Sequence, residues 1–124
     1  MRVLVVEDEA LLRWSLAEIL RRQGHTVIEA GSAGDAREAI RSTPAPVDVI
    51  FLDYRLPDSN DLRLLEEIRR DVPRSAVVLM TAYATSEVVQ GALERGAYCV
   101  ISKPFDLHDV HALVENARRT IRPH

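Results

Sequence analysis

Carboxylate, hydroxyl and amine side chains follow four of the short apolar runs in this 124-residue sequence. Glu7 and Asp8 come directly after the first run, and Asp53 comes after the third. Thr81 follows the fourth run, and Lys103 lies just beyond the fifth. A carboxylate can accept a phosphoryl group as an acyl phosphate, while nearby positive charges spread the charge of the transferring group. These residue types therefore predict phosphoryl-transfer chemistry, provided that the chain brings them together.

Three carboxylates in one site need a source of positive charge. Two carboxylates ~4 Å apart repel by roughly 4 kcal/mol at an effective dielectric constant of about 20. Crowded carboxylates therefore take up protons or bind a cation. No Cys or His stands at these run ends, and oxygen ligands suit Mg²⁺ rather than zinc. Glu7, Asp8 and Asp53 together carry three negative charges, which one Mg²⁺ and Lys103 would neutralise.

The residues can meet only if the apolar runs are strands of one sheet. The runs are rich in β-branched residues and several are almost continuously apolar, as expected for strands buried on both faces. They cover residues 3–6, 26–30, 47–52, 76–80 and 98–101. Longer amphipathic stretches separate them, and this alternation predicts a parallel sheet with helices on both faces and right-handed crossovers. In such a sheet all strands end at one edge, where ligands bind.

The amphipathic stretches predict five helices. Their apolar residues fall within 12–20, 36–40, 64–72, 88–93 and 107–121. Gly24 and Gly96 are expected to end the first and fourth helices, and Pro73 the third. Asp106 is expected to be the N-cap of the last helix, whose apolar pattern runs to Ile121.

Composition indicates one ordinary globular domain. Hydrophobic residues make up 47% and charged residues 28% of the chain. The net charge of −3 gives no electrostatic support for direct nucleic-acid binding. The single cysteine, Cys99, fits a reducing compartment, so we expect a cytoplasmic location. No apolar segment is long enough for a membrane span, and no membrane partner is expected.

Four segments resemble the receiver domain of two-component response regulators. They read VVEDE (5–9), FLDYRLPD (51–58), MTAYAT (80–85) and GAYCVISKPFD (96–106). LRWSL (12–16) and MTAYAT look most like receivers of nitrogen-regulation-type (NtrC-like) transcription activators. The resemblance implies an α/β fold: a (βα)₅ flavodoxin-like, three-layer domain with a five-stranded parallel sheet of order 2-1-3-4-5. It covers the chain 1–124 as one receiver domain, compatible with a segment of a longer regulator.

The resemblance also implies roles for the acidic residues. Asp53 would be the phosphoacceptor, taking its phosphoryl group from a histidine on a sensor histidine kinase. Asp8 would bind Mg²⁺ directly and Glu7 through water, with the backbone carbonyl of Arg55 as a further ligand alongside Asp53. The protein would then be a signalling phosphoacceptor rather than an enzyme, with only self-catalysed phosphotransfer and autodephosphorylation.

Three further residues would handle the phosphoryl group by the same resemblance. Thr81 and the backbone N–H of Ala82 would bind its oxygens, and Lys103 would pair with Asp53 and then with the phosphate. The family's Lys–Pro bond implies that Lys103–Pro104 is cis. Phosphorylation would switch the face made by the fourth helix, fifth strand and fifth helix, with a homodimer through that face. An output domain, if the chain continues, would control transcription.

The sequence departs from the family pattern at three positions. Val100 stands where receivers usually carry a switching aromatic, Asp61 where a turn glycine is common, and Cys99 where Asp is frequent. Tyr98 is expected on the same side of its strand as Val100 and is interpreted as packing on the last helix or forming a partner surface. Val100 and Asp61 leave open an alternative, a pseudo-receiver that acts as an interaction module without phosphate.

Other chemistries fit the sequence less well. A haloacid-dehalogenase-like phosphatase would need a second acid two residues after Asp53, where this chain has Arg55. A dinucleotide-binding domain would need a glycine-rich loop after the first strand, and none is present. His108 and His111 lie three apart on the last predicted helix, with no third metal ligand evident. We interpret them as part of a solvated or interface face.

Overall fold

A computed structural model describes residues 1–120 of the chain. Its centre is one sheet of five parallel strands in the order β2-β1-β3-β4-β5. The strands are β1 (Arg2–Val6), β2 (Thr26–Ala30), β3 (Val49–Asp53), β4 (Ala76–Thr81) and β5 (Cys99–Ser102). Both the parallel sheet and its predicted strand order are therefore confirmed.

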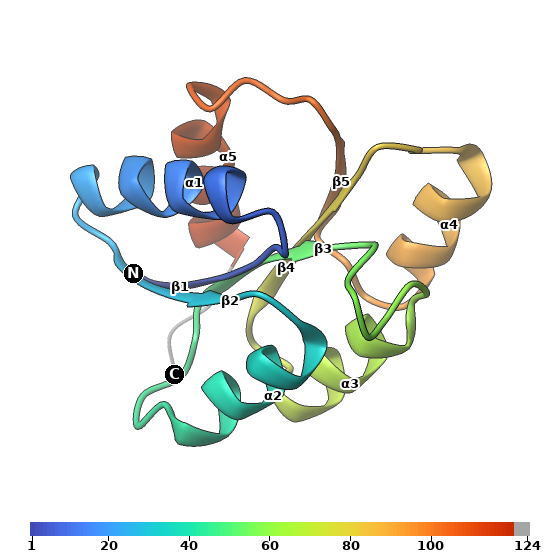
Figure 1. The fold of residues 1–124 in the computed structure, drawn as a ribbon, viewed down its shortest axis with the longest axis horizontal. Helices are drawn as coiled ribbons and strands as arrows, with labels where there is room; N and C mark the ends of the chain where they lie inside the picture. Colours follow the sequence, from blue (N-terminus) through green and yellow to red (C-terminus); the bar gives the residue numbers. More distant parts are fainter. Residues whose placement is uncertain (121–124) are drawn as a thin grey trace.

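Helices alternate with the strands and cover both faces of the sheet. They are α1 (Ala10–Arg22), α2 (Ala33–Ser42), α3 (Arg63–Asp71), α4 (Ser86–Glu94) and α5 (Asp109–Thr120). Helices α1 and α5 lie over one face, and α2 and α3 over the other, as Figure 1 shows. Helix α4 packs on this second side, because its buried Ala92 belongs to the same apolar cluster as α2 and α3. The flavodoxin-like three-layer α/β fold is confirmed.

The central strands are apolar throughout because their side chains pack into two apolar cores, one on each face of the sheet. Val5 and Phe51 pack towards α1 and α5. Leu4 and Ile50 pack towards α2, α3 and α4. Successive side chains of a strand point to opposite faces, so a strand covered on both faces needs apolar residues at every position.

Two predicted helix ends are confirmed by their backbone geometry. Gly24 follows α1 with φ +92°, and Gly96 follows α4 with φ +95°. This left-handed conformation is disfavoured for residues with a Cβ, so glycine suits both turns. Helix α3 ends at Asp71, shortly before Pro73, as expected.

The start of α5 lies later than the sequence predicts. The helix begins at Asp109, because Leu107 and His108 form a turn that precedes it. Asp106 still caps this turn, since its Oδ1 accepts a hydrogen bond from the N–H of His108 at 2.9 Å. Ile121, the end of the predicted apolar pattern, lies outside the described residues.

None of the helices within residues 1–120 is long and apolar enough to cross a membrane.

The loop between β3 and α3 is tied to the start of α2. Asp58 accepts hydrogen bonds from the backbone N–H groups of Ala33 (2.8 Å) and Gly34 (3.0 Å), through its two carboxylate oxygens. Ser32 caps the same helix by accepting from the N–H of Asp35 at 3.0 Å. The first N–H groups of a helix have no hydrogen-bond acceptor within the helix. Asp58, which is distant in sequence, provides the acceptor for two N–H groups at the start of α2.

Asp61 occupies its turn without strain. No residue other than glycine has a positive φ within residues 1–120, so Asp61 avoids the left-handed conformation. Its Oδ1 accepts from the N–H of Arg63 at 2.9 Å, closing a local turn before α3. This loop therefore closes without a glycine at that position.

Replacement of Asp58 by alanine should lower the free energy of unfolding by about 1 kcal/mol, because two N–H groups of α2 lose their acceptor. Asp58→Asn keeps an acceptor oxygen and should cost clearly less. The two backbone hydrogen bonds hold the pKa of Asp58 below its usual range. Its contribution should therefore be present at neutral pH and be lost as the pH falls from about 4 through that lowered pKa. Urea unfolding at several pH values measures both effects, and equal stability of the alanine and asparagine variants would contradict the capping role.

Candidate functional site

The predicted site residues meet at the carboxyl-terminal edge of the sheet. They line one hollow of about 320 Å³, together with Glu9: Glu7, Asp8, Asp53, Arg55, Thr81, Ala82 and Lys103. The strand register places Glu7 beside Asp53, because Val6 and Leu52, the residues directly before them, are paired between β1 and β3. All seven residues singled out from the sequence therefore line the same hollow.

The three carboxylates form a compact oxygen cluster. Glu7, Asp8 and Asp53 each offer an oxygen within 4.8 Å of the other two. Glu7 is 1% and Asp53 6% exposed, whereas Asp8 is open to solvent. Two buried carboxylates and an exposed one, all oxygen donors, fit a hard divalent cation such as Mg²⁺ entering from the solvent side.

Lys103 supplies the positive charge inside this cluster. Its Nζ donates to Glu7 and lies 3.1 Å from Oδ2 of Asp53. Burial by itself would lower the pKa of Lys103. The hydrogen bond to Glu7 and the charge of Asp53 outweigh burial, so the pKa is raised and the ammonium form is held.

The backbone at Lys103 is joined to the end of β4. The N–H of Lys103 donates to the carbonyl of Thr81 at 2.8 Å, joining the ends of β4 and β5. The Lys103–Pro104 peptide bond is cis, as expected from the sequence.

Glu7 is held in place by Glu9, which follows the same strand, and by Arg13, which sequence reasoning missed. The N–H of Glu9 donates to Oε2 of Glu7 at 3.1 Å, and Nη1 of Arg13 donates to the Glu7 carbonyl at 2.8 Å. Arg13 also lies 3.4 Å from the Glu29 carboxylate of β2. The sequence carries no signal for Arg13, because its contacts depend on how α1 crosses the strand ends.

Tyr83 and Arg55 form a cover beside the hollow. The Arg55 guanidinium lies 5.3 Å from the centre of the Tyr83 ring, a cation–π arrangement. The N–H of Tyr83 donates to Thr81 Oγ1 at 3.1 Å, and the N–H of Arg55 donates to Asp53 Oδ1 at 3.3 Å. The sequence singled out Arg55 only for its carbonyl; its side chain links the loops that follow β3 and β4.

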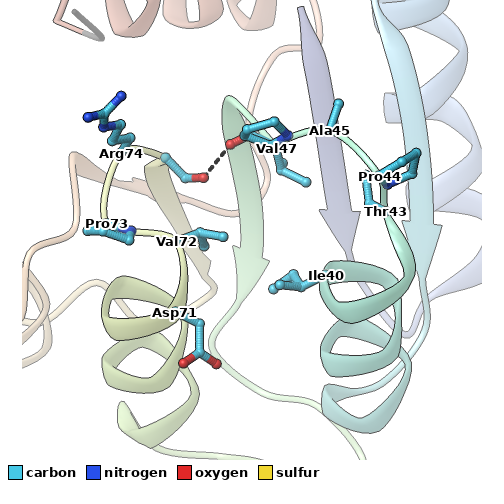
Figure 2. A pocket seen from close by; sticks show the side chains of 11 residues that line it. Ile40, Thr43, Pro44, Ala45, Val47, Asp71, Val72, Pro73 and Arg74 are labelled. Atoms are coloured by element: carbon cyan, nitrogen blue, oxygen red, sulfur yellow. Dashed lines mark hydrogen bonds between the residues drawn. The ribbon is translucent and has the colours of Figure 1, made fainter. Parts of the chain in front are cut away.

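A larger hollow of about 430 Å³ lies at the opposite edge of the sheet. Ile40 and Val72 face each other across it, with Pro44 and Pro73 at its ends (Figure 2). Ser75 donates to the carbonyl of Val47 beside it. This hollow lacks the clustered carboxylates and lysine, so the chemistry places the candidate site at the smaller one.

Comparison with known proteins agrees with this geometry. The family model described as "response regulator receiver domain" matches residues 3–115. The chain belongs to the response regulator receiver domain family. It is a signalling phosphoacceptor domain rather than a classical enzyme, and its acidic cluster fits the phosphorylation site of that family.

Relatives of the nitrogen-regulation type are among the most similar proteins. The chain is 35% identical to the DNA-binding transcriptional regulator NtrC of Escherichia coli K12 over 116 residues, 93% of this chain and 24% of that protein. The receiver domain of NtrX from Brucella abortus is 35% identical, with a TM-score of 0.84 over 95% of this chain and 98% of that one. The beryllofluoride-activated NtrC4 receiver domain dimer has a TM-score of 0.88 at 29% identity, with 98% of each chain covered. This receiver spans about a quarter of the length of NtrC.

The two residues near the usual switch position lie on different sides of the receiver's sheet. Val100 packs against the cluster under α2, α3 and α4. Tyr98 packs against the apolar cluster that includes Val110 and Val114 of α5, on the side of the last helix. The expectation that both share one side is wrong, because β5 begins only at Cys99 and strand alternation does not extend to Tyr98.

Replacement of Lys103 by methionine should lower the free energy of unfolding by roughly 3 kcal/mol, because two buried carboxylates lose their counter-charge. Adding Asp53→Asn should recover part of that loss, since one of the carboxylates is then neutral. Arg63→Met is the matched control, because its ion pair with Asp61 is exposed and should contribute less than about 1 kcal/mol. Urea unfolding of the single and double variants in metal-free buffer measures the coupling, and strictly additive effects would contradict it.

Proposed function

We propose that this receiver accepts a phosphoryl group on Asp53 from the phosphohistidine of a sensor histidine kinase, in a Mg²⁺-dependent reaction. The observation that carries the proposal is the buried Asp53 carboxylate, 3.1 Å from Lys103 Nζ and within the Glu7/Asp8 oxygen cluster. Receiver domains as a family receive phosphoryl groups from histidine kinases, and this chain retains each residue type that the transfer needs.

In this reaction the phosphoryl group moves from a histidine nitrogen to a carboxylate oxygen. A carboxylate oxygen of Asp53 attacks phosphorus, the bond to the histidine nitrogen breaks, and the imidazole leaves with the electron pair. Lys103 would move its hydrogen bond from Asp53 to a phosphoryl oxygen and stabilise the developing charge. Bound Mg²⁺, held by Asp8, Asp53, the Arg55 carbonyl and, through water, Glu7, would neutralise the remaining negative charge.

Thr81 and Ala82 would bind the transferred group. Thr81 Oγ1 accepts from the N–H of Tyr83, which leaves its own hydrogen available to a phosphoryl oxygen. Ala82 lines the same hollow, and its backbone N–H would donate to a phosphoryl oxygen. A shift of Thr81 towards the phosphate would pull the loop 82–85 and the start of α4, and so change the face formed by α4, β5 and α5.

The partners of that face follow from the relatives. NtrC is a DNA-binding transcriptional regulator, and the activated NtrC4 receiver is a dimer. We therefore propose that phosphorylation controls a homodimer through α4, β5 and α5, and through it the output of a longer cytoplasmic transcription regulator. This domain would not contact nucleic acid itself, consistent with its net charge of −3.

A phosphate-independent pseudo-receiver is the second candidate. The aliphatic Val100 favours it, because no aromatic side chain stands at that position to couple Thr81 to the partner face. The intact set of Asp53, Thr81 and Lys103 favours phosphorylation instead.

Incubation with Mg²⁺ and acetyl phosphate should add one phosphoryl group, seen by intact mass and removed by alkali. Asp53→Ala should abolish the addition, because the nucleophile is lost. Asp61→Ala is the matched control, because Asp61 is an exposed acid of the loop after β3 that does not line the hollow and should leave the addition unchanged. A modification that persists in Asp53→Ala, or none in the unaltered protein, would overturn the proposal.

Replacement of Val100 by tyrosine should leave the yield of Asp53 phosphorylation largely unchanged but alter the dimerisation that follows it. The reason is that residue 100 lies away from the carboxylates and packs beneath the proposed partner face. Analytical ultracentrifugation with and without beryllofluoride measures the coupling in both proteins. Beryllofluoride without effect on the association of the unaltered domain would favour the pseudo-receiver, and identical shifts in both proteins would show that residue 100 takes no part in the readout.

A further inference from the structure

Two histidines and a glutamate meet at the end of the molecule remote from Asp53. His25 lies in the turn between α1 and β2, whereas His111 and Glu115 lie on α5. Each offers one ligand atom, and all three atoms lie within 4.8 Å of one another. Because His25 directly precedes β2, the group sits at the amino-terminal edge of the sheet, opposite the carboxylates. The sequence spacing singled out His108 with His111, but the structure brings His111 to His25 instead.

His25 is buried with one ring nitrogen unsatisfied. The residue is 8% exposed, and its Nε2 has no hydrogen-bond partner within residues 1–120. The other ring nitrogen, Nδ1, lies 3.2 Å from the amino group of Met1. A buried polar atom without a partner costs about 1–3 kcal/mol, so such an atom calls for an explanation.

The helical pair is held in position by the core beneath it. His111 and Glu115 are four residues apart and therefore neighbours on one face of α5. The adjacent Val110 and Val114 are buried in the core and fix the rotation of the helix. His111 is exposed and Glu115 half-buried, so both side chains can adjust towards a ligand while their backbone stays fixed.

We propose that His25, His111 and Glu115 form a site for a borderline divalent transition metal such as Zn²⁺, with a fourth position open to water. Two imidazoles and one carboxylate are a recognised zinc ligand set. Tetrahedral coordination with bonds of 2.0–2.2 Å requires donor atoms about 3.3 Å apart, and rotation of the His111 and Glu115 side chains can close the present distances to that value. Nε2 of His25 is the donor, because Nδ1 is already engaged and orients the ring.

The ligand chemistry separates this site from the carboxylate cluster. Imidazole nitrogens suit zinc and related metals, whereas an all-oxygen cluster suits Mg²⁺. Burial and then the nearby charge of the Met1 amino group lower the pKa of His25, which favours the neutral ring that binds metal. Metal at this site would fasten α5 to the start of β2.

Zn²⁺ affinity measured against a chromophoric chelator tests the site, with Mg²⁺ in large excess to occupy the carboxylate cluster. The unaltered protein should bind one equivalent of Zn²⁺. His111→Gln and Glu115→Gln should each weaken binding by about tenfold or more, since each removes one ligand. His108→Gln is the matched control, a neighbouring histidine of the same segment outside the cluster, and it should bind as the unaltered protein does.

Imidazole ¹⁵N resonances of the unaltered protein provide a second measurement that needs no substitution at the buried His25. Zn²⁺ should shift the Nε2 resonance of His25 and a ring nitrogen of His111 together at one equivalent, while His108 stays in place. The proposal would be overturned if the Nε2 resonance of His25 did not shift, if His108→Gln lost as much Zn²⁺ affinity as His111→Gln, or if Mg²⁺ displaced Zn²⁺. A hydrogen-bonded cluster that binds no metal would give the first of these results.

Discussion

The arrangement of this domain depends on the ammonium group of Lys103 between two buried carboxylates. Glu7 and Asp53 are almost fully buried, and ionised carboxylates reach such positions only when a positive charge accompanies them. Lys103 can reach both because β1, β3 and β5 end at one edge of the sheet. The raised pKa of Lys103 records that constraint, since the carboxylates favour its charged form more than burial disfavours it.

Residues at strand ends could be predicted from the sequence, and residues between elements could not. Asp53 and Lys103 follow apolar runs, and the parallel arrangement requires such residues to meet at one edge. Arg13 and Asp58 contact segments that the sequence pattern does not relate to them: the carbonyl of Glu7 and the first turn of α2. Their contacts depend on crossing angles and loop paths, which periodicity does not encode.

The same limit explains the histidines. Spacing along the sequence relates His111 to His108, but packing between α5 and the α1–β2 turn relates it to His25. Tyr98 gives a related lesson, because alternation predicts sides only within a strand, and β5 is a short one that begins at Cys99. Sequence pattern thus predicts how residues within one strand or helix are oriented. Contacts of residues beyond the end of an element, or between elements, require the structure.

The contact between Arg55 and Tyr83 joins the loop after the candidate phosphoacceptor to the loop that carries Thr81. The first of these loops is also anchored to α2 through Asp58, whereas the second ends in the exposed residues before α4. An exposed cation–π contact contributes about 0.5–1 kcal/mol, close to thermal energy. The Arg55–Tyr83 contact is therefore weak, and it joins a loop that is anchored to α2 to a loop that is exposed to solvent. Breaking this contact would cost little compared with the hydrogen bonds that anchor the first loop to α2.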